Sequence, residues 1–137
     1  MKVLFTGKKT ENIEYRNTAR STEVKLQVRV NVSVTKPNQV KTDSTIFVRQ
    51  AVMFGSPVDP FYLLVHHMTS YMVTDDSGLE GVSEEAQKKI INDTCIPLAT
   101  EKLNESLAQI CKGIGINPVQ LPPTLAAGPS MDVTQNN

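Results

Sequence analysis

Residues 93–115 read DTCIPLATEKLNESLAQICKGIG. From Ile96 onward, apolar residues recur every three or four positions, which predicts a helix with one apolar face. That face comprises Ile96, Ala99, Leu103, Leu107, Ile110 and Ile114, with Cys111 at its edge. The polar residues between them, which we expect to face solvent, are Thr100, Glu101, Lys102, Asn104, Glu105, Ser106, Gln109 and Lys112. Pro97 is tolerated in a first helical turn, where its missing N–H would have no partner anyway. Because glycine suits the residue after a helix, this helix should end at Gly113 or Gly115.

Four segments upstream predict the sheet on which this helix packs. Residues 24–34 alternate strictly, with six apolar residues on one parity and five polar residues on the other, as in a strand with one face in solvent. Residues 42–54 carry apolar residues on both parities, which predicts a central strand or one whose second face is covered in an assembly. Residues 61–73 form a further strand. Residues 3–15 alternate weakly around a polar segment at 7–12, which predicts a broken or bulged first strand.

The order of the elements predicts the fold class. Ser83, followed by Glu84 and Glu85, predicts the start of a short helix that ends before a break at residues 93–97. Strands followed by helices indicate an α+β fold with two layers. The connections at 35–41 and 55–60 are too short for parallel crossovers, so the sheet should be antiparallel. We expect one domain over residues 1–125, whose proline-rich segment 116–125 folds back over the body, and a flexible C-terminal tail over residues 126–137.

Composition indicates which partners and which cell compartment to expect. Fourteen basic and fourteen acidic residues cancel, so no overall charge favours binding to nucleic acid. No apolar run approaches the ~20 residues of a membrane span and no signal-peptide pattern is present, so we expect a cytoplasmic protein without membrane insertion. Cys95 and Cys111 would lie roughly 24 Å apart on one continuous helix, beyond disulfide reach, and are expected to be free thiols packed as small apolar groups. With 39% apolar and 5% aromatic residues, the core should be modest, which favours a homo-oligomer that shares burial between subunits.

Residue types that carry catalysis or metal binding do not combine into a site in this sequence. His66 and His67 are adjacent on a strand, so they point to opposite faces and cannot bind one metal ion together. The acidic pair Asp75-Asp76 suits the end of a strand, and Glu84-Glu85 suits a helix N-terminus. The glycines of Gly113-Ile114-Gly115 suit a helix C-terminus. We therefore predict no catalytic residues, no metal, no cofactor and no enzyme activity. An enzyme whose site is completed by another subunit is the weakest alternative.

Four short motifs occur in a characteristic order. A first strand ends in Ile13-Glu14-Tyr15, and Glu23-Val24-Lys25-Leu26 opens a long strand. After two more strands come Cys95-Ile96-Pro97, a long helix and Leu121-Pro122-Pro123. This order resembles the SecB family of export chaperones over about residues 1–125, and the order of the motifs carries the resemblance more than any one of them.

The resemblance implies a fold, an assembly and an activity. SecB-like proteins have a four-stranded antiparallel sheet with two helices packed on one face, and they assemble as dimers of dimers. They are cytosolic chaperones that hold unfolded polypeptides in apolar grooves between the loop after the first strand, the sheet and the long helix, without nucleotide or metal. By position, the resemblance implies these candidate peptide-binding residues: Tyr15, Val24, Leu26, Leu107, Ile110 and Leu121.

One departure concerns the partner in protein export. SecB proteins that deliver clients to the SecA motor present an acidic sheet surface. Here the solvent parity of the long strand is basic to neutral, and it comprises Lys25, Gln27, Arg29, Asn31 and Ser33. SecA-type docking is therefore doubtful, and a role beside an antitoxin or in a phage process stays open. The alternative to a chaperone is a non-catalytic structural or assembly protein, for example one encoded by a phage or mobile element, that uses the same sheet surface as a subunit interface.

Overall fold

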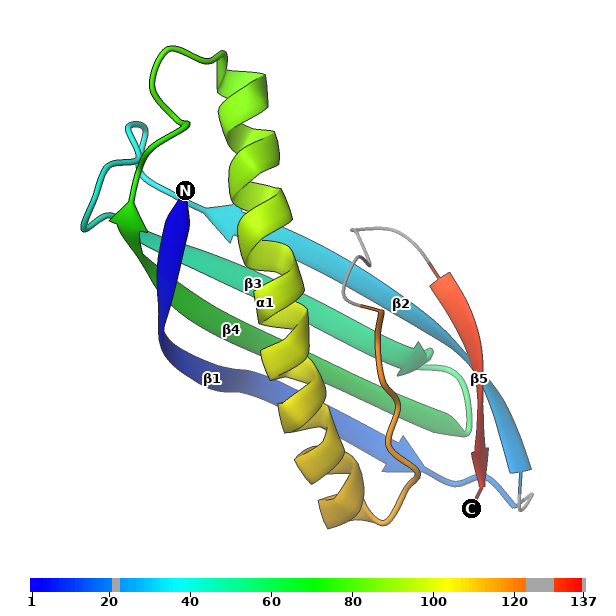
Figure 1. The fold of residues 1–137 in the computed structure, drawn as a ribbon. Coiled ribbons are helices and arrows are strands. Elements are labelled where there is room, and N and C mark those ends of the chain that lie inside the picture. The colour runs from blue at the N-terminus through cyan, green and yellow to red at the C-terminus, as the bar shows by residue number, and fades with distance from the viewer. Residues whose placement is uncertain (21–22, 123–129, 137) are drawn as a thin grey trace.

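Five strands form one antiparallel sheet in the order β1-β4-β3-β2-β5 (Figure 1). Their bounds are β1 Lys2–Asn17, β2 Glu23–Thr35, β3 Thr45–Gly55, β4 Phe61–Asp75 and β5 Ser130–Asn136. The computed structural model describes residues 1–20, 23–122 and 130–136. The four strands that the sequence predicts are present and antiparallel, and β5 is a fifth strand that the sequence does not predict. The predicted domain boundary at residue 125 falls outside the described residues.

The first strand is continuous but irregular. β1 pairs with β4 along its whole length, and the register shifts between Phe5 and Gly7 and again between Thr10 and Asn12. These are β-bulges, which bend and twist a strand without ending it. The bulged first strand that the sequence predicts is thereby confirmed, with one register shift inside the polar segment 7–12 and another just before it.

Because side chains alternate along β2, β3 and β4, every second residue of these strands points toward the face that the helix covers. The buried apolar residues of these strands are Leu26, Val28, Val30, Ile46, Val48, Val52, Phe54, Phe61, Leu63, Val65, Tyr71 and Val73. On the other face, β2 is exposed, whereas several apolar side chains of β3 and β4 are partly buried by their neighbours. β3 lies between β4 and β2, so the central position predicted from its mixed parity is confirmed.

In the part of the chain that the structure describes, one helix, α1 (Glu84–Ile114), crosses one face of this sheet (Figure 1). The prediction of two helices separated at residues 93–97 is therefore wrong. Pro97 removes one backbone hydrogen bond inside the helix, which by itself favours a break. Burial on both sides of it outweighs that preference, because Cys95 and Ala99 are fully buried against the sheet. The hydroxyl of Thr94 also donates to the Ile90 carbonyl oxygen at 2.8 Å, one turn before the proline.

Both ends of α1 follow the sequence signals. The Ser83 side chain accepts a hydrogen bond from the Ala86 backbone N–H, and acidic residues occupy the first turn. Gly115 takes a left-handed conformation with φ of 78°, and its N–H bonds to the last turn of the helix. The predicted N-cap and C-terminal glycine are confirmed.

The buried face of α1 differs from the predicted one. It comprises Ile91, Cys95, Ala99, Thr100, Leu103, Ser106, Leu107 and Cys111. Ile96, Ile110 and Ile114 are only partly buried and lie at its margins. The prediction that Thr100 and Ser106 face solvent is wrong, because both meet buried polar side chains of the sheet. The two cysteines, by contrast, belong to the centre of the face.

Two apolar cores lie between α1 and the sheet. The first, which we call the tail-side core, joins β2, β3 and β4 to Leu103, Leu107 and Cys111 of α1 and to Ile116 and Leu121 beyond it. The second surrounds Ile46, Tyr71, Ile91 and Cys95 near the start of α1. The segment after α1 turns back alongside the helix (Figure 1), so the predicted return over the body is confirmed for residues 116–122. Within the described residues, no helix combines the length and apolarity needed to cross a bilayer.

Candidate functional site

β1 carries exposed apolar side chains at the edge of the sheet. Phe5, Ile13 and Tyr15 pair with β4 residues that are buried beneath α1, so they lie on the helix-covered face. They are nevertheless 37%, 46% and 38% exposed, respectively. The Phe5 ring lies 6.0 Å from that of Tyr71, and the Tyr15 ring meets Phe61 edge-on at 5.8 Å. These contacts hold the aromatic rings in place without covering them.

A depression of about 350 Å³ lies where α1 passes over the middle of β1. We call it the β1–α1 groove. Its lining comprises Lys8, Lys9, Thr10, Ser106, Gln109 and Ile110. Ile110 is the apolar member of this lining and is partly exposed. The side chains around it are hydrogen-bond donors and acceptors, so the groove combines an apolar contact with polar ones.

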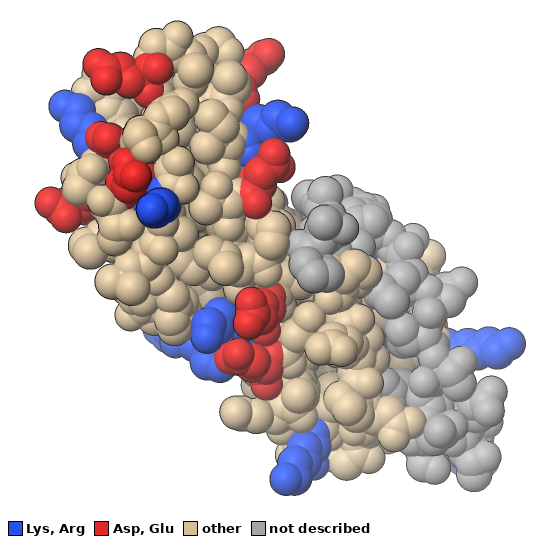
Figure 2. Space-filling model, viewed as in Figure 1, with Lys and Arg blue, Asp and Glu red and all other residues tan. Residues whose placement is uncertain are grey.

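Charged side chains connect β1 to α1 beside this groove. The Lys8 Nζ atom lies 3.5 Å from the Glu105 carboxylate, and Lys102 Nζ lies 3.7 Å from the same group. Lys102 also lies over the Phe5 ring, with Nζ 4.6 Å from the ring centre. All these groups are partly exposed, so each contact contributes about 1 kcal/mol or less. Figure 2 shows acidic and basic side chains next to each other near the middle of this face, with a largely uncharged surface below them toward the C-terminal end of α1.

A second depression, of about 850 Å³, lies on the other side of α1 against the returning segment. Its lining comprises Pro97, Leu98, Glu101, Asn104, Glu105, Ala108, Gln120, Leu121 and Pro122. The Asn104 amide donates to the Leu121 carbonyl oxygen at 2.9 Å and accepts from the Leu121 N–H at 2.8 Å. This pair of bonds fixes the segment to the helix, so the wall of the depression is tied down.

The six residues implied by the resemblance do not form one surface. Tyr15 is exposed on β1, and Ile110 lines the β1–α1 groove. Leu26, Leu107 and Leu121 are 4%, 0% and 2% exposed and belong to the tail-side core. The side chain of Val24 lies outside the described residues. A role in peptide binding stays a prediction for all six, and among the five whose side chains the structure describes, Tyr15 and Ile110 are the two that a partner can reach.

The sequence pattern also missed accessible residues. Phe5 and Ile13 share the exposed parity of Tyr15, but the bulges between them shift the alternation and hide it in the sequence. The ion pair of Lys8 and Glu105 joins positions far apart in the chain, so no local pattern could predict it. The weak alternation of residues 3–15 was the available signal, and the register shifts along β1 are its cause.

Buried polar side chains meet beneath α1, between the two cores. His67 is 1% exposed, and its Nε2 lies 3.0 Å from the Ser106 hydroxyl. Gln50, its register partner on β3, donates to the Thr100 hydroxyl at 3.0 Å. Among the described residues, neither His67 Nδ1 nor Gln50 Oε1 has a hydrogen-bond partner. Burial, and then the nearby Lys8 ammonium, lower the pKa of His67 from its ordinary value, while the Glu11 carboxylate opposes them.

Acidification is therefore expected to destabilise the protein through His67. Its pKa is lower in the folded state than the ordinary value of 6.5, so the unfolded chain binds the proton more readily. The neutral imidazole's contribution to stability is complete above about pH 6.5 and is lost as the pH falls below it. Urea unfolding across this range should show a smaller loss of stability on acidification for His67→Gln than for the unsubstituted protein. His66→Gln, at an exposed position on the opposite face, should retain the full loss. If the free energy of unfolding fell equally with pH for His67→Gln and the unsubstituted protein, this assignment would be contradicted.

The two cysteines are free and fully buried. Burial raises the pKa of the Cys95 thiol to about 11 and also raises the pKa of Cys111. Protonated, enclosed thiols are poor nucleophiles. The prediction of unpaired cysteines packed as small apolar groups is confirmed.

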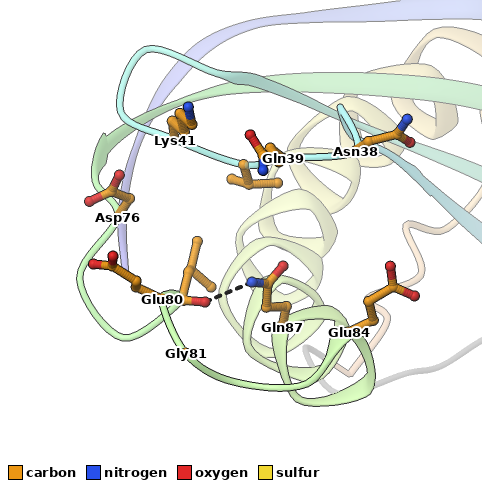
Figure 3. A pocket seen from close by; sticks show the side chains of 10 residues that line it. Asn38, Gln39, Lys41, Asp76, Glu80, Gly81, Glu84 and Gln87 are labelled. Carbon is orange, nitrogen blue, oxygen red and sulfur yellow. Dashed lines mark hydrogen bonds between the residues drawn. The ribbon is translucent and has the colours of Figure 1, made fainter.

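A further depression, of about 500 Å³, lies at the start of α1 (Figure 3). The loop before β3, the connection after β4 and the first turns of α1 supply its walls. Asp76, Glu80 and Glu84 line it together with Lys41. Figure 3 shows the Gln87 amide donating to a main-chain oxygen, that of Leu79, at 2.6 Å. Asp76 also accepts from the Thr42 N–H at 3.3 Å, and Glu84 lies in the first turn of α1, so loop bonding and the helix start account for these two carboxylates.

Comparison with known proteins gives similarity in structure but none in sequence families. No protein-family model and no curated protein matches this sequence. The Mycobacterium tuberculosis SecB-like chaperone Rv1957, solved in complex with a ChAD peptide from the antitoxin HigA1, has a similar structure, with a TM-score of 0.56. The match covers 90% of this chain and 88% of that chain, at 10% sequence identity. The fold is SecB-like.

A second solved structure is more distant. A protein of unknown function from Streptococcus agalactiae matches with a TM-score of 0.48 and 11% identity, over 89% of this chain and 98% of that one. At 10% identity, the similarity to the chaperone establishes the architecture alone. The fold part of the sequence resemblance is therefore confirmed, with one helix in place of the two expected.

Proposed function

We propose that this protein is a SecB-like molecular chaperone or adaptor that binds unfolded or extended polypeptides in the cytoplasm. The observation that carries the proposal is the exposed apolar strip of β1 beside the β1–α1 groove, on a SecB-like fold. The similar structure from Mycobacterium tuberculosis is a chaperone bound to a peptide. Peptide binding here needs no cofactor and no catalytic group, and we propose no enzyme activity.

The physical basis of binding is burial of apolar side chains from both partners. Phe5, Ile13 and Tyr15 each keep more than a third of their surface exposed, and burial contributes roughly 25 cal/mol per Å². Because this interaction is non-directional, it accepts many client sequences. Lys8 and Lys9 at the groove add a preference for clients without clustered positive charge.

Homo-oligomer formation is part of the proposal. β1 has a hydrogen-bonding edge with no strand beside it in the described chain, and it is sixteen residues long. A long open edge of this kind is a template for pairing with another chain. A dimer formed across β1 would extend the sheet, and a dimer of dimers is the assembly that the family resemblance implies. SecA-type docking is not proposed, because the exposed face of β2 carries Lys25 and Arg29; a client from an antitoxin system stays open.

A structural or assembly role is the second candidate. The face of the sheet opposite α1 has no cover among the described residues and carries a row of partly buried apolar side chains: Phe47, Met53, Leu64, Met68 and Met72. Such a row suits a permanent subunit interface as well as a client. A chain of this kind would form stable particles without any effect on an unfolded protein.

Client capture can be tested with one substitution in the groove. Ile110→Asp places a charge in the β1–α1 groove, and we expect it to weaken binding of a reduced, unfolded client at least tenfold, equivalent to about 1.4 kcal/mol. Val58→Asp is the control, because Val58 is 90% exposed on the β3–β4 loop and lies outside the groove. Suppression of client aggregation and mass by light scattering are measured for both variants. If Ile110→Asp loses client capture and assembly to the same extent, Ile110 is part of the subunit structure and the proposed groove is wrong.

A further inference from the structure

The outer edge of β2 is occupied by the chain's own C-terminal segment. β5 pairs antiparallel with β2 from Glu23 opposite Asn136 to Arg29 opposite Ser130 (Figure 1). On its other side, β2 pairs with β3 only from Val28 onward. Residues 23–27 therefore extend beyond β3, and β5 is the strand that they pair with in the described chain.

β5 has the sequence of a weak strand. Its seven residues, Ser130–Asn136, include two apolar ones, and Asp and Asn are depleted in strands. A seven-residue edge strand forms its main-chain bonds with one neighbour only. Main-chain bonds of this kind do not depend on sequence, so another extended segment can form the same ones.

The two faces of this edge differ in chemistry. Leu26 and Val28 are 4% and 1% exposed and belong to the tail-side core. Lys25 and Arg29 lie on the opposite face and are exposed. A strand placed along this edge thus has an apolar core on one side and two positive charges on the other. The β5 sequence has that pattern, because Asp132 stands between Met131 and Val133 and pairs in register with Gln27.

We propose that the edge of β2 at Glu23–Arg29 is a strand-exchange site. β5 occupies it in the free chain. An extended client segment, with apolar residues on one parity and an acidic residue on the other, replaces β5 by pairing with β2. This inference rests on the proposed function and names the place and the chemistry of client recognition. It also gives a role to Val24 and Leu26 through their main chain, which pairs with β5 at Gln135 and Val133.

A reversible disulfide between β2 and β5 tests the exchange. Directly paired residues of antiparallel strands have Cα atoms about 4.5–5.5 Å apart, which suits a disulfide. The double variant Gln27→Cys/Asp132→Cys joins one such pair. Cys95 and Cys111 are buried, so the two introduced cysteines are the thiols that an oxidant reaches. The probe is a fluorescent peptide with the sequence of residues 130–136, added to the oxidised and the reduced protein.

We expect the reduced protein to bind the peptide and the oxidised protein to bind it at least tenfold more weakly. A peptide with lysine in place of the aspartate should bind the reduced protein more weakly, because it meets Lys25 and Arg29. The single variant Gln27→Cys should show no redox response. Equal binding in both redox states, no binding in either, or failure to form the disulfide within one chain would overturn the proposal. A disulfide between chains would overturn it as well, since a second copy would then supply the strand.

The unfolded client separates this inference from the chaperone function. If the protein captures the client equally well locked and unlocked, strand exchange is wrong and the chaperone function stands. If the reduced protein exchanges the peptide but neither form holds a client in solution, the chaperone function is wrong. In that case the edge is a site for one native partner strand. Capture by the reduced form alone supports both.

Discussion

Replacing Leu107 by alanine is expected to lower the free energy of unfolding by about 2–5 kcal/mol. Leu107 is 0% exposed and packs in the tail-side core with Leu103, Cys111 and Leu121. Truncation removes its apolar contacts and leaves a cavity beneath a helix that the returning segment holds in place. Urea unfolding of the purified variant measures the loss.

Leu98→Ala is the matched control for this substitution. It makes the same chemical change on the same helix, but Leu98 is 40% exposed at the second depression, and we expect a loss below about 1 kcal/mol. The two variants together separate packing from client binding. A Leu107→Ala protein that unfolds like the unsubstituted one but no longer captures a client would show that Leu107 faces a partner.

Gly55→Ala is expected to destabilise the protein by about 3 kcal/mol. Gly55 ends β3 with φ of 71°, a conformation that costs a side chain energy. An added Cβ would also overlap the carbonyl oxygen of Phe61, which belongs to the backbone of β4 and cannot move aside. The β3–β4 hairpin would have to deform at the point where it supports the tail-side core.

Gly81→Ala separates the two causes. Gly81 has a similar φ of 75°, but nothing lies within 4 Å of the added Cβ, so conformational strain of about 1–2 kcal/mol is expected alone. Thermal or urea unfolding of both variants gives the difference between them. Equal losses would mean that the overlap at Gly55 is relieved by a small shift of the hairpin.

The strands could be predicted because their signal is local. Alternation along residues 24–34 places Leu26, Val28 and Val30 on the buried face, and the structure agrees. The continuity of α1 could not be predicted in the same way. Pro97 is a local signal for a break, whereas the burial of Cys95 and Ala99 against the sheet depends on residues far away in the chain. β5 was missed because a short polar sequence becomes a strand only when an edge is available to pair with it.

The candidate site could be predicted only in part from the helical repeat. Leu107 and Ile110 both fall on the apolar repeat of the helix, yet one is in the core and the other lines a groove. A helical repeat gives the direction of a side chain but not what covers it. Which part of the helix meets the edge of β1, and which part the returning segment covers, is decided by how α1 crosses the sheet. Sequence patterns contain no measure of that crossing.

The strand order has a consequence for how this chain folds during synthesis. Of the four strands that form the main sheet, β1 is synthesised first and its partner β4 is synthesised last. β2, β3 and β4 follow one another as hairpins and need no distant segment, so they are free to pair first. Until β4 has been synthesised, the nascent chain holds an unpaired segment with Phe5, Ile13 and Tyr15 in the open. The docking of β1 onto β4 is therefore the step that completes the main sheet and pairs this apolar segment.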